Sequence, residues 1–122
     1  VPASQKNQVL SKNEVGRAFR DKIPGIYQIF GDSRDIGTYA RLKGKAVDLA
    51  FIDGNHSFDA VVRDTRNVLK FTKKRSIIFW HDFKDSDADG IIEVKQALDS
   101  LCYSERLKIF HIHKTWLAFT II

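Results

Sequence analysis

The chain has 122 residues, of which 43% are hydrophobic and 29% charged, the composition of one soluble globular domain. The formal net charge is +5, but the basic residues are scattered, so we expect a solvated surface and no nucleic-acid partner. No apolar run approaches the roughly 20 residues that a membrane span needs, and the single cysteine, Cys102, excludes an intramolecular disulfide, so a cytoplasmic location is expected.

The first part of the chain predicts a helix and then a strand. Residues 11–14 (Ser-Lys-Asn-Glu) have the spacing of a capping box, and apolar residues follow at helical intervals to about Lys22. Pro24-Gly25 ends this predicted helix. Residues 26–30 form a short β-prone run closed by a glycine, which predicts a strand.

A helix and a second strand are expected next. Asp32 and Ser33 are suited to cap a helix over about 34–42, which Gly44 would end. Residues 47–53 are mostly apolar, as in a strand of a parallel sheet that is covered on both faces.

The clearest helix of the sequence begins after Ser57, which is expected to cap it. Its apolar residues recur at the intervals of one helical face. They are Phe58, Val61, Val62, Thr65, Val68 and Leu69. Residues 76–80 then predict a second buried strand, which ends at His81 and Asp82.

The last third predicts a helix and a hairpin. Ile91, Val94, Leu98 and Leu101 share one helical face, and Cys102 is expected to be buried in that helix. Residues 108–113 and 116–122 predict two strands with a very short connection, which requires an antiparallel pair. The order of these predicted helices and strands along the chain predicts an α/β fold of Rossmann-like type, with a mainly parallel sheet, helices on both faces and a C-terminal antiparallel hairpin.

Polar groups follow three of the predicted strands, at the edge of the sheet where ligands bind. Asp53, His81 and Asp82 offer two carboxylates and an imidazole, a set suited to a divalent cation such as Mg²⁺. His56 could act as a general base beside a carboxylate. The alternative is that both aspartates cap the following loops and both histidines bind backbone groups.

Two further patterns are weaker. Residues 85–90 match the first half of a calcium-binding loop, but Gln96 stands where a bidentate glutamate is needed, which favours a solvated loop. His111 and His113 share one face of a strand without an acidic or cysteine partner nearby, which favours a surface role.

Three segments together resemble a known family. They are Gly-Asp-Ser at 31–33, Val-Asp-Leu-Ala-Phe-Ile-Asp-Gly-Asn-His-Ser-Phe at 47–58 and Ile-Ile-Phe-Trp-His-Asp-Phe at 77–83. They resemble the class I S-adenosylmethionine-dependent methyltransferases, and within them the small-molecule O-methyltransferase-like group in which one strand ends FIDGDHSY and the next ends HD. The resemblance runs from about residue 15 to the C-terminus.

The resemblance implies roles for particular residues. In metal-using relatives, residues matching Asp53, His81 and Asp82 hold a divalent cation, and a histidine matching His56 serves as base. His81 replaces an acidic residue of that pattern and is a softer ligand. The segment matching Asp32 and Ser33 lies against the adenine of the cofactor, so Asp32, Ser33 and Asp53 are the expected cofactor-binding residues.

The front of that family pattern is missing from the sequence. No strand, glycine-rich turn and helix of the type E-x-G-x-x-x-G occurs, so residues 1–122 are expected to be a single domain that lacks this element. The complete form would transfer a methyl group to an oxygen of a small molecule or sugar, and this chain alone is expected to be inactive. The alternatives are a non-catalytic binding scaffold and a metal-dependent hydroxylase-like relative. An exposed sheet edge would also favour a homodimer.

Overall fold

The computed structural model describes residues 23–42, 44–84 and 92–122, and the chain divides into two compact units, Val1–Gly31 and Asp32–Ile122. In the described part of the first unit, Gly25 has φ 86° and the Ile26 amide donates to the Ile23 carbonyl at 3.3 Å, so residues 23–26 form a turn. The strand predicted at 26–30 is wrong, since these residues form no strand. β propensity produces a strand only where a neighbour completes its hydrogen bonds. The helix predicted at 11–22 lies outside the described residues.

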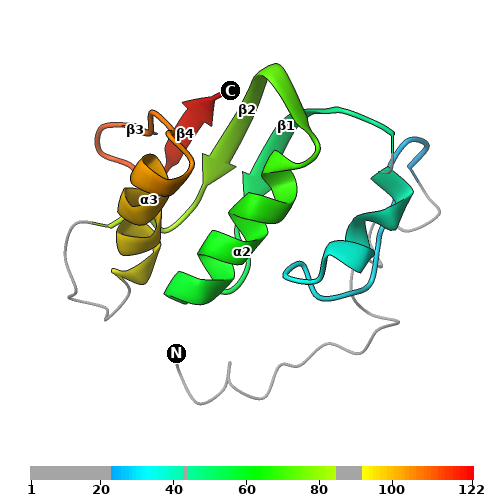
Figure 1. Ribbon diagram of the computed structural model, residues 1–122, viewed down its shortest axis with the longest axis horizontal. Coiled ribbons are helices and arrows are strands. Elements are labelled where there is room, and N and C mark those ends of the chain that lie inside the picture. The colour runs from blue at the N-terminus through cyan, green and yellow to red at the C-terminus, as the bar shows by residue number, and fades with distance from the viewer. Residues whose placement is uncertain (1–22, 43, 85–91) are drawn as a thin grey trace. The chain divides into compact units, whose positions relative to one another are not determined.

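The second unit contains a four-stranded sheet (Figure 1). Its strands are β1 (Val47–Ile52), β2 (Thr72–Trp80), β3 (Phe110–His111) and β4 (Ala118–Ile121), in the order β1-β2-β4-β3. β1 and β2 are parallel, whereas β2 with β4 and β3 with β4 are antiparallel. The predicted mainly parallel sheet is therefore wrong. The short hairpin connection reverses β4, and the strand that would have added a second parallel pair is absent from this sheet.

Two α-helices connect these strands, α2 (Phe58–Leu69) and α3 (Glu93–Ser104). Ser57 caps α2 as predicted, because its hydroxyl accepts the Ala60 amide at 3.3 Å. Figure 1 shows both helices on the same side of the sheet. Helices on the other face stay a prediction, because the helix expected at 11–22 lies outside the described residues.

The core lies between these two helices and the sheet, and alternate residues of each strand point into it. Trp80 is 1% exposed, and its indole N–H donates to the Thr65 hydroxyl at 2.9 Å. The other buried apolar residues of the cluster come from α2, α3, β2 and β4. They are Val61, Val62, Ile78, Val94, Ala97, Leu98, Leu101 and Ala118. Cys102, predicted to be buried with them, is only half-buried.

The opposite face of the sheet is apolar and exposed. Adjacent strand residues point to opposite faces, so Leu49 and Phe51 lie opposite the core side of β1. Leu49, Phe51, Phe110 and Ile121 are each about half exposed, at 57%, 54%, 49% and 57%. Phe58, predicted to belong to the buried stripe of α2, is also 40% exposed.

The segment before β1 forms a 3₁₀ helix, η1 (Ile36–Leu42), in place of the α-helix predicted over 34–42. Asp35 begins it, since the Asp35 carboxylate accepts the Gly37 amide at 2.9 Å and the Asp35 carbonyl accepts the Thr38 amide at 3.0 Å. These are bonds to nearby residues, which favour a tight turn over a regular α-helix.

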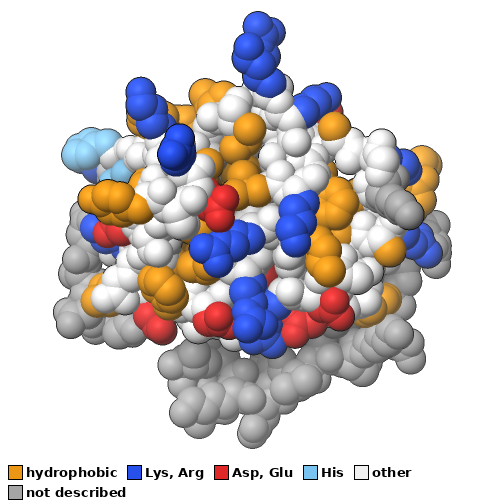
Figure 2. Space-filling view, in the orientation of Figure 1, with side chains coloured by type: hydrophobic (Ala, Val, Ile, Leu, Met, Phe, Trp, Pro, Cys, Tyr) orange, Lys and Arg blue, Asp and Glu red, His pale blue; other side chains and the backbone are white. Residues whose placement is uncertain are grey.

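Charges of both signs cover the helical side of the second unit (Figure 2). Three ion pairs lie on these helices or link them: Arg63 with Asp59 at 3.2 Å, Arg66 with Glu105 at 3.0 Å and Lys95 with Asp99 at 3.1 Å. Within the described ranges, no helix is long and apolar enough to cross a membrane.

Candidate active site

The ends of β1 and β2 bring the predicted polar residues together. Ile52 and Trp80 are paired in register, so Asp53 and His81 leave the sheet from neighbouring positions. The His81 amide donates to the Ile52 carbonyl at 3.3 Å, which extends the pairing beyond the strands. In parallel strands, both carboxyl ends meet at one edge of the sheet.

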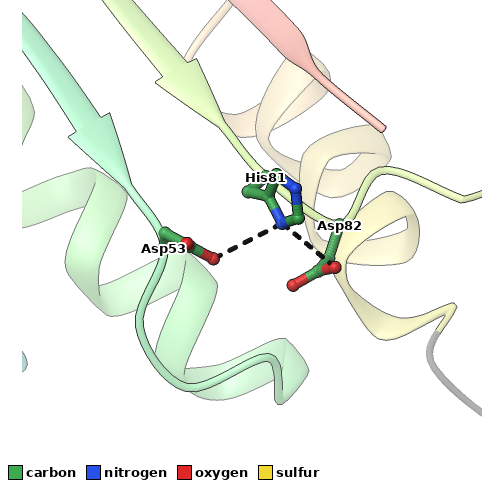
Figure 3. A group of neighbouring side chains, drawn as sticks. All are labelled: Asp53, His81 and Asp82. Carbon is green, nitrogen blue, oxygen red and sulfur yellow. Dashed lines mark ion pairs between the residues drawn. The ribbon is translucent and has the colours of Figure 1, made fainter. Parts of the chain in front are cut away.

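His81 lies between the two carboxylates (Figure 3). Its Nδ1 atom is 3.6 Å from Asp53 Oδ1 and 3.1 Å from Asp82 Oδ1. One ligand atom from each of the three residues lies within 4.8 Å of the others. Two carboxylate oxygens and one imidazole nitrogen at this spacing fit a divalent cation with room for solvent or substrate oxygens.

Asp82 joins this cluster to the predicted base. Its Oδ2 atom is 2.8 Å from Nδ1 of His56, while its Oδ1 atom faces His81. The Asp82 side chain is 13% exposed, and its backbone has φ 63°, in the left-handed region that non-glycine residues rarely occupy. Unfavourable backbone conformations of this kind are often held in place at functional sites.

The predicted cofactor segment is held against α2. The Ser33 hydroxyl donates to Asp64 Oδ1 at 2.7 Å, and the Asn67 amide donates to the carbonyls of Ser33 and Arg34, each at 3.0 Å. The Tyr39 hydroxyl also donates to the Ser33 carbonyl at 2.8 Å. Ser33 is thereby placed at one side of an open hollow.

This hollow has a volume of about 380 Å³ and lies beside the end of β1. Aromatic, apolar and carboxylate groups line it, and Asp53 belongs both to this lining and to the cation-type cluster. Its lining residues are Ser33, Tyr39, Phe51, Ile52, Asp53, Gly54, Asp64 and Val68.

Asp32, the other expected cofactor residue, is not among the residues that line the hollow. It is exposed and binds the Arg34 guanidinium, with Nη2 to Oδ2 at 2.8 Å. Hydrogen bonds from Arg34 lower the pKa of Asp32 to about 2, so this carboxylate stays ionised.

Asp64 was not predicted as a site residue, although its side chain lines the hollow. It is 4% exposed, and burial raises the pKa of its carboxyl group. Asp64 lies three residues after Val61 and four before Val68, so it falls on the apolar face of α2. An acidic residue within the apolar stripe of a helix is the sequence signal that could have indicated a functional role for Asp64.

Comparisons with known proteins agree with this fold. Residues 4–83 match the sequence model of a family described as a methyltransferase domain. The match covers 80 of the 122 residues, so the chain belongs to this family. No curated protein matches the chain.

Among solved structures, the chain is similar to the apo structure of CalS11, a TDP-rhamnose 3′-O-methyltransferase of calicheamicin biosynthesis. The TM-score is 0.59 at 12% sequence identity, and the match covers 75% of this chain but 38% of that enzyme. At this identity the likeness shows the fold, which is that of a class I methyltransferase. The chain therefore spans well under half the length of this structural relative.

Proposed function

We propose that this domain is part of an S-adenosylmethionine-dependent methyltransferase that transfers a methyl group to an oxygen of a small molecule or sugar. The observation that carries the proposal is the convergence of Asp53, His81 and Asp82 at adjoining strand ends, with His56 bound to Asp82. Membership of the methyltransferase family supports it, as does the O-methyl transfer stated for the structural relative.

A divalent cation such as Mg²⁺ would be held by Asp53, His81 and Asp82. When bound, it would polarise an acceptor hydroxyl and make its proton easier to remove. The two carboxylates supply negative charge for the cation, and the imidazole must be unprotonated on the nitrogen that faces it. Cation binding is therefore expected to weaken as the pH falls.

His56 is the proposed general base. Its Nδ1 atom faces Asp82 at 2.8 Å, which favours the tautomer with the proton on Nδ1 and leaves Nε2 as the acceptor. Asp82 then orients the ring and stabilises the imidazolium that forms when the acceptor proton is taken.

The cofactor is proposed to lie in the hollow lined by Ser33, Asp53 and Tyr39. Its volume of about 380 Å³ is in the range of small-molecule sites. Phe51 and Tyr39 offer flat surfaces for a purine, and Ser33 and Asp53 offer polar groups at its rim. Asp32, ionised beside Arg34, is proposed to act next to this hollow on the side of the ribose or adenine.

One observation favours a second candidate, a binding scaffold without catalysis. The sequence has no E-x-G-x-x-x-G-like run to hold the methionine part of the cofactor. A domain with the scaffold and the strand-end cluster could retain ligand binding while lacking the chemistry.

Titration calorimetry with S-adenosylmethionine separates the two candidates. We expect the 122-residue chain to bind the cofactor and Ser33→Ala to weaken that binding by about threefold to tenfold, through the lost contact and the loosened segment. Ser104→Ala, at the end of α3, is the control and is expected to bind as the unmodified chain does. An absence of heat at about 1 mM cofactor would rule against catalysis by this chain and favour the scaffold.

A further inference from the structure

A second hollow, which shares no lining residue with the proposed cofactor hollow, has no role in the function proposed above. Its volume is about 320 Å³, and His81, Lys114, Thr115, Trp116 and Leu117 line it. Apart from His81, all of these residues belong to the connection between β3 and β4. His81 thus lines this hollow and also belongs to the proposed cation site.

The connection between β3 and β4 is held in one conformation by its own hydrogen bonds. The Thr115 amide and hydroxyl both donate to the Ile112 carbonyl, at 3.1 and 2.7 Å. The Ile112 amide donates to the Leu117 carbonyl at 3.0 Å, and the Thr115 hydroxyl accepts the Leu117 amide at 3.1 Å. This connection forms one wall of the hollow, and because it is already ordered, a ligand can bind without the entropy cost of ordering it.

This wall is also tied directly to the proposed cation site. The Phe83 amide, one residue after Asp82, donates to the Trp116 carbonyl at 3.0 Å. The rings of His81 and Trp116 meet edge to face, with centroids 6.2 Å apart. The indole is therefore placed at a set distance from the ring that would ligate the cation.

Trp116 offers an aromatic surface in this position. It is 52% exposed, and the Lys84 ammonium lies 3.8 Å from the ring centroid. Lys84 is 9% exposed, so it packs beneath the indole and holds it in place. A half-exposed indole that is held by its neighbours is suited to stack on a ring of a ligand.

Positive charge marks the mouth of the same hollow. Lys114 is exposed, has φ 62° and makes no ion pair with any residue that the structure describes. An exposed ammonium beside an aromatic surface attracts a ligand that carries a carboxylate or phosphate. The left-handed backbone at Lys114 directs the turn that brings Lys114 and Trp116 to one hollow.

We propose that this hollow binds the methyl acceptor, and that the acceptor is a hydroxylated ring compound with an anionic substituent. The ring stacks on Trp116, the anionic group faces Lys114, and a hydroxyl reaches past His81 toward the cation site. This inference rests on the proposed methyl transfer to oxygen, because it is that reaction which requires an acceptor hydroxyl at this place.

The test is an NMR titration with two probes that differ by one carboxylate, 3,4-dihydroxybenzoate and catechol. The chain has two tryptophans, and their indole N–H signals can be followed separately. We expect 3,4-dihydroxybenzoate to shift the signal of Trp116 and to leave that of buried Trp80 in place. An unmoved Trp116 signal at about 10 mM of this probe would overturn the proposal.

Two lysine variants test the anionic contact. We expect Lys114→Gln to weaken 3,4-dihydroxybenzoate about twofold to fivefold, the range for one exposed charge pair, and to leave catechol unchanged. Lys108→Gln, which removes an exposed charge outside the lining of this hollow, is the control and should change neither affinity. Equal affinity of the unmodified chain for the two probes would refute the preference for an anion.

Two tryptophan variants test the aromatic surface, with the amide signal of Leu117 as the reporter. Trp116→Phe keeps a ring and is expected to bind within about threefold of the unmodified chain, whereas Trp116→Ala is expected to lose binding about tenfold. An unchanged Trp80 signal shows that each variant is folded. Retention of full affinity by Trp116→Ala would exclude stacking.

These titrations are run first without a divalent cation and then with Mg²⁺. Probe binding without Mg²⁺ tests the hollow alone. Failure of Mg²⁺ to bind would count against the proposed function, and failure of the probes to shift Trp116 would count against this inference. The two failures are therefore separate results.

Discussion

Asp82→Asn is the substitution that most directly tests the proposed cation site. It keeps the size of the side chain and one carbonyl oxygen but removes the negative charge between His56 and His81. The same change at Asp53 removes the other carboxylate of the cluster. The two variants differ in how strongly solvent screens the charge that is lost.

The expected magnitudes follow from that screening. A pair of unit charges 4 Å apart contributes about 1 kcal/mol in water and about 4 kcal/mol at the effective dielectric of a partly buried site. The Asp82 side chain is 13% exposed and that of Asp53 is 44% exposed. We therefore expect Asp82→Asn to weaken Mn²⁺ binding by about 2.7 kcal/mol, or about a hundredfold, and Asp53→Asn by about 1.4 kcal/mol, or about tenfold.

Titration calorimetry with Mn²⁺ measures both losses, since Mn²⁺ takes the same oxygen and imidazole ligands. Asp99→Asn is the matched control, because Asp99 is an exposed carboxylate paired with Lys95 on α3. The proposed cation site would be refuted by Asp82→Asn binding Mn²⁺ as tightly as the unmodified chain. It would also be refuted by a larger loss at Asp53 than at Asp82, or by an equal loss at Asp99.

Three further predictions concern stability. Burial raises the pKa of Asp64 above 3.8, so its proton is held more tightly in the folded state, and the native protein loses stability as the pH rises from about 4. Asp64→Asn keeps an acceptor for the Ser33 hydroxyl but has no group that titrates, so the thermal stability of this variant should fall less between about pH 4 and pH 7 than that of the unmodified chain. The same pH profile for the two proteins would contradict this prediction. Ser57→Ala removes the acceptor for the Ala60 amide and should cost about 1 kcal/mol in urea unfolding, whereas no loss would mean that the cap is dispensable. Leu98→Ala, at a fully buried position of α3, should cost about 2 to 5 kcal/mol by the same measurement, and a cost below about 1 kcal/mol would show that the core refills.

The strand-end residues could be found from the sequence because a short local pattern defines them. An apolar run that stops at Asp53, and another that stops at His81, place both side chains at the same edge of a parallel pair. The contact of His56 with Asp82 could not be read from spacing. It depends on the left-handed backbone at Asp82, which orients the carboxylate between two rings.

Other parts of the site come from residues far apart in the sequence. Asp64 and Ser33 are 31 positions apart, and their contact exists because α2 packs beside the segment that precedes η1. Trp116 reaches His81 because the turn between β3 and β4 lies next to the end of β2. No periodicity or motif encodes distances of this kind.

The wrong predictions about the sheet have one physical origin. Residues 26–30 have β propensity, but a strand also needs a neighbour for its hydrogen bonds, and only the tertiary structure shows whether one is present. Without that strand the sheet has one parallel and two antiparallel pairs.

The elements whose signals are local could be predicted from the amino-acid sequence. These are the capped stripe of α2, the apolar runs of β1 and β2, the face of α3 and the antiparallel hairpin. The tertiary structure decided which strands pair, which face the helices cover and which polar side chains meet around Asp82. The physical reason is that helix and strand periodicity depend on neighbours along the chain, whereas pairing, burial and side-chain contact depend on neighbours in space.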